Sequence, residues 1–396
     1  MLLSLALIFI LGLILSGLFH RIRLPGLLGM MMTGIILGPF GLNAISSDIM
    51  HLSADLREIA LIVILLRAGL SLDLDDLKIV GRPAVLLSFL PATLEMLAII
   101  ILAPWLFGIG YLEAALMGSV VAAVSPAVVV PRMISLMEYG YGQDKRIPTL
   151  IMAGSSLDDV YVIVWFSVFL GMLQGQGFEA AQWLRVPFAI VFGFLAGLVI
   201  SRWLIAFFQR IHIRDTVKVL ILLSISFVLV SLEDLLPSVI PFSGLLAVMT
   251  LGGGILKYYP ILAKRIMGKF GKIWVAAEIL LFVLVGTAVN LSVLAEASML
   301  SLVLLLGALS FRIIGVFLSL YKTALLPKEK LFCAIAYLPK ATVQAAIGTI
   351  PLTLGLASGQ IILSVAVLSI MVAAPLGAIG IDKTFEHLLS HPQDSA

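Results

Sequence analysis

Long apolar stretches recur along the whole chain, and the short connections between them carry most of the charged residues. Thirteen of these stretches are close to the length of about 20 residues that an α-helix needs to cross the hydrocarbon core of a bilayer. We expect the helices at residues 2–19, 25–43, 57–72, 83–107, 112–131, 148–172, 185–208, 215–231, 239–256, 273–294, 296–321, 329–352 and 357–380. The pattern predicts an all-α polytopic membrane protein with about thirteen transmembrane helices.

The composition agrees with this pattern and excludes a soluble domain. Hydrophobic residues make up 61% of the 396 residues, charged residues only 12%, and the mean hydropathy is +1.18. The first stretch lacks the positive leader region and the small-residue cleavage site of a signal peptide, so we interpret it as a retained helix. The single cysteine, Cys333, excludes an internal disulfide, and the five histidines lack metal-ligand spacing.

The distribution of Lys and Arg predicts the topology. Twenty of the 25 basic residues lie in or beside connections that follow odd-numbered stretches, including the basic segment from Lys257 to Lys272, or in the C-terminal tail. Because positive charge marks the cytoplasmic side, we expect an N-terminus outside and a C-terminus in the cytoplasm, in the plasma (inner) membrane. The net charge of +3 therefore reflects topology and membrane lipids, and no nucleic acid or soluble partner is implied.

An internal repeat relates stretches that are seven apart. Residues 26–34 (GLLGMMMTG) match residues 244–252 (GLLAVMTLG) at five of nine positions, and residues 61–74 align without gaps with residues 281–294. Since an odd offset reverses direction across the membrane, this indicates two inverted six-helix repeats joined by the seventh helix.

Prolines interrupt the fifth and twelfth stretches, which are also seven apart. We expect breaks at Pro126 and Pro131 in the fifth and at Pro339 in the twelfth. A proline removes a backbone donor and frees carbonyl groups, which are tolerated at membrane depth only where protein or water in a cavity satisfies them. Lys340, directly after one break, is positioned to compensate the partial negative charge of such carbonyls.

Two adjacent aspartates, Asp158 and Asp159, lie inside the sixth stretch and are the principal candidates for function. A carboxylate at the centre of a membrane helix costs about 2.5 to 3.5 kcal/mol on insertion scales, so such a pair indicates an ion or proton pathway. We expect Asp159 to be the main cation ligand and proton acceptor, with Asp158 lining the site or forming an ion pair. Hydroxyl groups of Ser125, Ser155 and Ser156 are candidate oxygen ligands for a hard monovalent cation.

Two further charges lie at membrane depth on stretches related by the repeat, Glu95 in the fourth and Arg312 in the eleventh. An unpaired buried charge is strongly unfavourable. We therefore expect Arg312 to bridge to Glu95 or to Asp158.

Three motifs in this order resemble the NHA-type, sodium/hydrogen exchanger-like branch of the monovalent cation/proton antiporters: residues 124–131 (VSPAVVVP), 154–159 (GSSLDD) and 338–346 (LPKATVQAA). The resemblance spans nearly the whole chain. It implies a homodimer with elevator-type alternating access, in which sodium or lithium competes with protons at Asp158 and Asp159. The implied division is a dimerisation scaffold at 1–82 and 215–294, a mobile core at 83–172 and 296–381, and a linker helix at 185–208.

Stoichiometry and cation choice have more than one reading. The paired aspartates favour two protons per cation and electrogenic exchange, whereas Arg312 replaces a lysine of many electrogenic relatives and does not release its proton. The alternatives to sodium/proton exchange are potassium/proton antiport and sodium-coupled symport of an organic solute. An intramembrane aspartyl protease is disfavoured because Asp158 and Asp159 are neighbours on one helix. The sequence contains no nucleotide-binding or redox motif, so we expect no enzyme activity and no cofactor.

Overall fold

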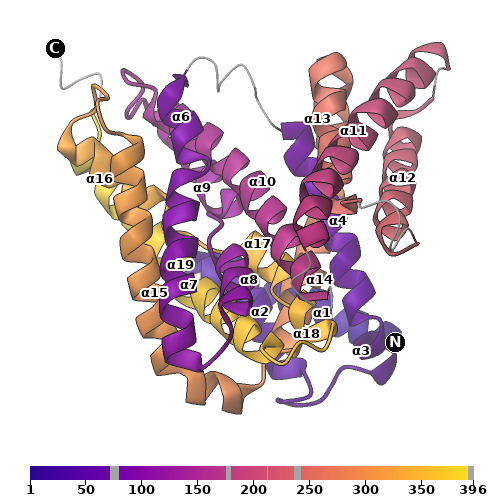
Figure 1. The fold of residues 1–396 in the computed structure, drawn as a ribbon, viewed down its shortest axis with the longest axis horizontal. Helices are drawn as coiled ribbons and strands as arrows, with labels where there is room; N and C mark the ends of the chain where they lie inside the picture. The colour runs from indigo at the N-terminus through magenta and orange to yellow at the C-terminus, as the bar shows by residue number, and fades with distance from the viewer. Residues whose placement is uncertain (72–79, 175–179, 212, 236–241, 391–396) are drawn as a thin grey trace. The chain divides into compact units, whose positions relative to one another are not determined.

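The computed structural model describes residues 1–71, 80–174, 180–211, 213–235 and 242–390, and every regular element in these ranges is a helix (Figure 1). Within them, nine helices are long and apolar enough to cross a membrane, and two further apolar helices are shorter. The predicted all-α membrane fold is confirmed. The number of membrane crossings and the inverted repeat stay predictions.

The chain divides into two compact units, each described here by itself. The first comprises Met1–His51, Asp73–Val162 and Phe282–Ala396, and the second comprises Leu52–Leu72 and Ile163–Leu281. Helices of the first unit are α1 (Leu2–Arg21), α2 (Gly26–Leu37), α3 (Ser47–His51), α6 (Arg82–Leu87), α7 (Leu90–Phe107), α8 (Tyr111–Val121), α9 (Pro126–Tyr139), α15 (Leu291–Ser319), α16 (Pro327–Ala336), α17 (Thr342–Ile347), α18 (Ile350–Thr353) and α19 (Gly359–Leu388). Those of the second are α4 (Ser53–Ser71), α11 (Ala180–Arg210), α12 (Asp215–Leu235) and α13 (Gly244–Tyr258), and α10 (Ile147–Gln174) and α14 (Pro260–Thr287) contribute to both.

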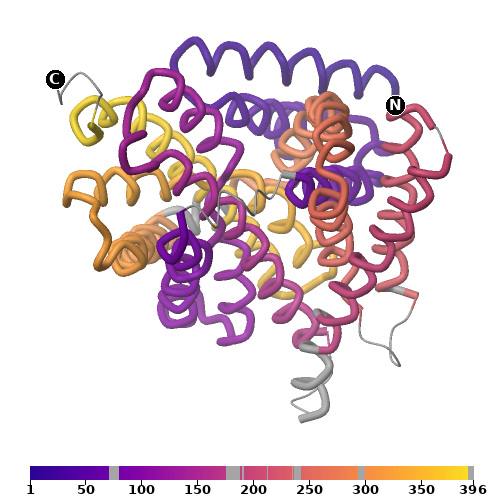
Figure 2. Tube along the Cα trace, turned by 90° about the horizontal axis from the view of Figure 1, so that it is seen from above, coloured from indigo at the N-terminus to yellow at the C-terminus, as the bar shows by residue number. Residues whose placement is uncertain are grey.

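In the first unit, α7 packs along α15, and α16 and α19 pack on each other (Figure 1). Buried side chains from α6, α9, α10, α15, α16 and α19 form a hydrophobic core within the first unit. Phe332, Met133 and Ile151 of this core are fully buried. Figure 2 shows α1 running along the outside of α2. This packing places two interrupted helices, α8–α9 and α16–α17, inside the unit.

Two helix pairs approach to backbone contact at glycines. A Cβ atom at Gly34 of α2 would overlap the backbone of Val283 and Gly286 in α14, and one at Gly252 of α13 would overlap the backbone of α4 at Leu66 and Leu70. Only glycine permits such close approach. Gly34 and Gly252 are aligned by the repeat inferred above, and so are their partner helices. The contacts are therefore those expected of a repeat.

The expected stretch at 83–107 forms one candidate membrane span, Arg82–Phe107, with a turn at Ser88 and Phe89 between α6 and α7. Pro91 lies in the first turn of α7 and cannot supply a helical hydrogen bond there. One expected boundary was wrong. The basic segment Lys257 to Lys272 is helical rather than a connection, apart from a break at Tyr259. Its buried Leu262, Ile266 and Phe270 alternate with exposed basic residues at helical spacing, a pattern that mean hydropathy does not detect.

Candidate ion-binding site

The two interrupted helices meet at their breaks. The first break separates α8, which ends at Val121, from α9, which begins at Pro126; the second lies between Ala336 and Thr342. The backbone N–H of Ser125 in the first break donates to the carbonyl of Pro339 in the second, at 2.8 Å. Backbone groups that no helix satisfies are thus brought together inside the first unit.

The prolines act differently from one another. Pro126 lies in the first turn of α9, where the missing N–H costs nothing, and Pro339 lies within the second break. Pro131 was expected to break its helix, but it lies inside α9, which continues to Tyr139. The chain leaves α8 at Ala122, so the break comes before Pro126. Pro131 lies further along α9, which continues past it.

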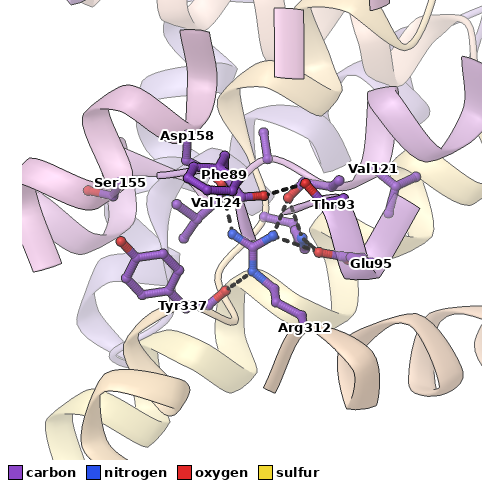
Figure 3. A network of polar contacts seen from close by, with 12 residues as sticks. Phe89, Thr93, Glu95, Val121, Val124, Ser155, Asp158, Arg312 and Tyr337 are labelled. Atoms are coloured by element: carbon purple, nitrogen blue, oxygen red, sulfur yellow. Dashed lines mark hydrogen bonds and ion pairs between the residues drawn. The ribbon is translucent and has the colours of Figure 1, made fainter. Parts of the chain in front are cut away.

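Arg312 of α15 is the centre of the charged network. Its NH1 lies 2.7 Å from Oε2 of Glu95 on α7, and its NH2 lies 3.0 Å from Oδ2 of Asp158 on α10. Its Nε donates to the carbonyl of Tyr337 at 2.6 Å. Figure 3 shows the guanidinium directed at these three groups. All three charged side chains are fully buried. Arg312 therefore pairs with both Glu95 and Asp158, which the sequence had left as alternatives.

Lys340 adds the fourth buried charge. Its Nζ lies 2.6 Å from the same Glu95 oxygen and 3.2 Å from the carbonyl of Ala122, to which Arg312 also donates. Lys340 therefore meets a freed carbonyl of the first break, the position expected from the sequence. Its pairing with Glu95 was not expected. Arg312, Lys340, Glu95 and Asp158 together carry two positive and two negative charges.

The two aspartates have different surroundings. Oδ2 of Asp158 accepts the backbone N–H of Val124 at 2.7 Å in addition to the guanidinium of Arg312. Asp159 is 7% exposed, and its buried Oδ1 has no hydrogen-bond partner among the described residues. Within those residues Asp159 also makes no ion pair. Its negative charge is the one that the network leaves without a partner.

The candidate hydroxyl ligands lie beside the aspartates. Ser155 and Ser156 precede them on α10 and donate to the carbonyl of Met152 at 3.1 and 2.9 Å. Their hydrogens are engaged within the helix, and the oxygens keep lone pairs for a cation. The hydroxyl of Ser125 is fully buried, 3.5 Å from that of Thr342.

Two residues of the site were missed in the sequence. Gln344 of α17 donates to the carbonyls of Val121 and Ala123 in the first break. Tyr337 has a fully buried side chain in the second break, and the hydroxyl would overlap a Cβ atom at Gly154 of α10. The signal for Gln344 was present, since it is a polar residue inside an apolar helix. For Tyr337 there was none, because an aromatic residue is ordinary in a membrane helix.

In the described part of the chain, a buried network of compensated charges lies beside two broken helices and the carboxylate of Asp159, which has no ion-pair partner there. These features define a secondary transporter of small cations. Residues 5–386 match the model of the family described as sodium/hydrogen exchanger, transmembrane, and the chain belongs to that family.

Similar proteins agree with this assignment. The chain is 34% identical to sodium/hydrogen exchanger 9B2 of Mus musculus over 366 residues, which are 90% of this chain and 67% of that protein. It is 32% identical to human sodium/hydrogen exchanger 9B1 over 373 residues, 90% and 71% of the two chains. These relatives agree with the NHA-type resemblance. The sodium proton antiporter MjNhaP1 of Methanocaldococcus jannaschii has a similar fold, with a TM-score of 0.81, 24% identity, and coverage of 96% of this chain and 97% of that one.

Proposed function

We propose that this protein is a secondary active sodium (or lithium)/proton antiporter in which Asp159 is the carboxylate that exchanges cation for proton. The observation that carries the proposal is the charge balance of the buried network. Arg312, Lys340, Glu95 and Asp158 compensate one another, whereas Asp159 has no charged partner in the described part of the chain. A buried carboxylate of this kind needs either a bound cation or a proton. Competition between them for one site is antiport.

The mechanism follows from this competition. A sodium ion binds ionised Asp159 and neighbouring oxygens, for which Ser155, Ser156 and Ser125 are the candidates. The core then opens to the other side, where a proton displaces the ion, and the protonated core returns. Asp158 stays bound to Arg312 and to the N–H of Val124 throughout, so it supports the site rather than carrying the ion.

The remaining assignments follow the family resemblance. We infer a homodimer in the plasma (inner) membrane, with the N-terminus outside and the C-terminus in the cytoplasm. The mobile core comprises residues 83–172 and 296–381, the scaffold residues 1–82 and 215–294, and the linker residues 185–208. The contacts among α7, α10, α15 and the two breaks support a core that moves as one piece, since its buried ion pairs connect all of them.

The test is proton flux in proteoliposomes on addition of sodium, lithium or potassium, with a pH-sensitive dye inside. We expect sodium and lithium to drive proton movement in the intact protein and Asp159→Asn to abolish it. Asp382→Asn, the same substitution at a partly exposed aspartate of α19, is the control and should keep its activity.

Each other outcome has a defined meaning. Full activity in Asp159→Asn would contradict the assignment of the exchanging carboxylate. A response to potassium alone would identify a potassium/proton antiporter. No proton movement with any of the three cations would favour the sodium-coupled solute symporter.

A further inference from the structure

The amide of Gln344 spans the first helix break in a single orientation. Its Nε2 lies 2.9 Å from the carbonyl oxygen of Val121 and 2.8 Å from that of Ala123, and the side chain is 1% exposed. Both neighbours are acceptors, so only the NH₂ end of the amide can face them. Oε1 is buried and has no hydrogen-bond partner in the described part of the chain. Turning the amide over would place this oxygen against two carbonyl oxygens.

One peptide unit connects this amide to the ion site. The carbonyl of Ala123, held by Gln344, and the N–H of Val124, bound to Asp158, belong to the same peptide bond. A trans peptide is planar, and its C=O and N–H point in opposite directions. Gln344 and Asp158 therefore hold opposite edges of one rigid plane. The position of the amide determines whether a donor faces the carboxylate.

The flanking peptide units cannot replace this connection. The carbonyl of Ala122 binds Arg312 and Lys340, and the N–H of Ser125 binds the carbonyl of Pro339. Neither group touches Asp158. If the peptide between Ala123 and Val124 rotated, its carbonyl oxygen would turn towards the Asp158 carboxylate, and two negative groups would replace a donor and an acceptor.

We propose that Gln344 is a positioning residue for cation exchange: by holding the Ala123–Val124 peptide, it aims a backbone donor at Asp158 and keeps that carboxylate paired with Arg312. The proposal rests on the function proposed above. Without this donor, the Asp158 carboxylate loses its hydrogen bond to the first break, and its ion pair with Arg312 is no longer held in place. The freed guanidinium is then available to Asp159 and opposes cation binding. Gln344 thus acts on Asp159 through the Ala123–Val124 peptide, Asp158 and Arg312.

Gln344→Met tests this, because methionine has a similar length and no donors. A hydrogen bond to a charged group contributes enough that we expect about a tenfold rise in the sodium concentration for half-maximal exchange. The maximal rate at saturating sodium should change little. Gln360→Met is the matched control, since the amide nitrogen of Gln360 is buried without a partner in the described residues, and it should change neither value.

The intact protein and Asp159→Asn are measured in the same series. If the intact protein shows no sodium-driven proton flux, the proposed function fails, whatever Gln344 does. If it exchanges normally and Gln344→Met has an unchanged sodium dependence, the positioning role is overturned. Should Gln344→Met not fold, Gln344→Glu keeps the length and places an acceptor against both carbonyls, and at least the same rise in the sodium concentration for half-maximal exchange is expected. Loss of folded protein in both variants would assign Gln344 to the fold and overturn the proposal.

Discussion

The ammonium group of Lys340 lies 2.6 Å from Oε2 of Glu95, and Arg312 binds the same oxygen from 2.7 Å. One carboxylate on α7 therefore holds two cations, one from α15 and one from the second break, which lie 217 and 245 residues away in the sequence. In a bilayer interior, neither cation has water as an alternative partner. The arrangement ties α7, α15 and the second break to one another beside the first break.

The pair of Glu95 and Lys340 predicts a non-additive double variant. Removing one partner of a buried ion pair leaves an uncompensated charge and costs about 3 to 5 kcal/mol, so Glu95→Gln and Lys340→Gln should each lower the thermal stability strongly. The double variant restores charge balance and should be less destabilised than the sum of the two. Thermal unfolding of the detergent-solubilised protein measures this, and additive effects would contradict the shared pairing.

The contacts of Asp158 change the expected stoichiometry. The two aspartates alone suggest two protons per cation, but Asp158 binds Arg312 and the N–H of Val124. In the proposed mechanism, only Asp159 then exchanges a proton for the cation. We expect one proton per cation and no net charge movement. The sodium concentration for half-maximal exchange should then rise about tenfold per unit of pH decrease on the acidic side, because one proton competes with one ion.

Two measurements decide this. Rates in proteoliposomes with and without an imposed membrane potential should coincide, with a proton ionophore absent in both. A dependence on the potential, or a rise of about a hundredfold per pH unit, would mean that a second group takes up a proton.

The close approach of Gly154 to Tyr337 predicts that a second substitution restores exchange activity lost in the first. A Cβ atom at Gly154 would overlap the buried hydroxyl of Tyr337 and approach Cβ of Leu87 to 3.0 Å. Gly154→Ala should therefore displace Tyr337, whose carbonyl binds Arg312, and reduce exchange. Tyr337→Phe removes the overlapping oxygen, so the double variant should regain part of the activity. Exchange that is equally low in Gly154→Ala with and without Tyr337→Phe would show that the hydroxyl is not the obstacle.

Two ion pairs of the first unit should differ in strength. Arg132 and Asp382 lie 2.9 Å apart, with 23% and 43% of their side chains exposed, and such pairs contribute about 0 to 1 kcal/mol. Glu329 is fully buried, binds Lys145 at 2.9 Å and accepts the N–H of Leu326. Glu329→Gln should therefore destabilise the protein by about 1 to 3 kcal/mol, and Asp382→Asn by less than about 1 kcal/mol. Chemical or thermal unfolding of both variants in one detergent tests the order, and a larger loss in Asp382→Asn would reverse it.

The apolar pattern of the sequence was sufficient to locate the helices. A helix in a bilayer satisfies its own backbone, so length and hydropathy determine where it can lie, and each of the thirteen expected stretches contains helical structure. The breaks near Pro126 and Pro339 could also be predicted, because each break contains or directly precedes a proline, although Pro131 does not break its helix. The turn at Ser88 and the helix through Lys264 could not be predicted, since the first depends on packing and the second on amphipathic spacing.

The candidate site was only partly determined by the sequence. The cost of burying charge is local, and it was enough to single out Asp158, Asp159, Arg312 and Lys340. Which oxygen each cation meets depends on the crossing of segments about 150 to 250 residues apart, and hydropathy contains no information on that. The tertiary structure alone decided that Asp158 is paired and that Asp159 has no ion-pair partner among the described residues, because a hydrogen bond requires a donor within about 3 Å and the correct direction.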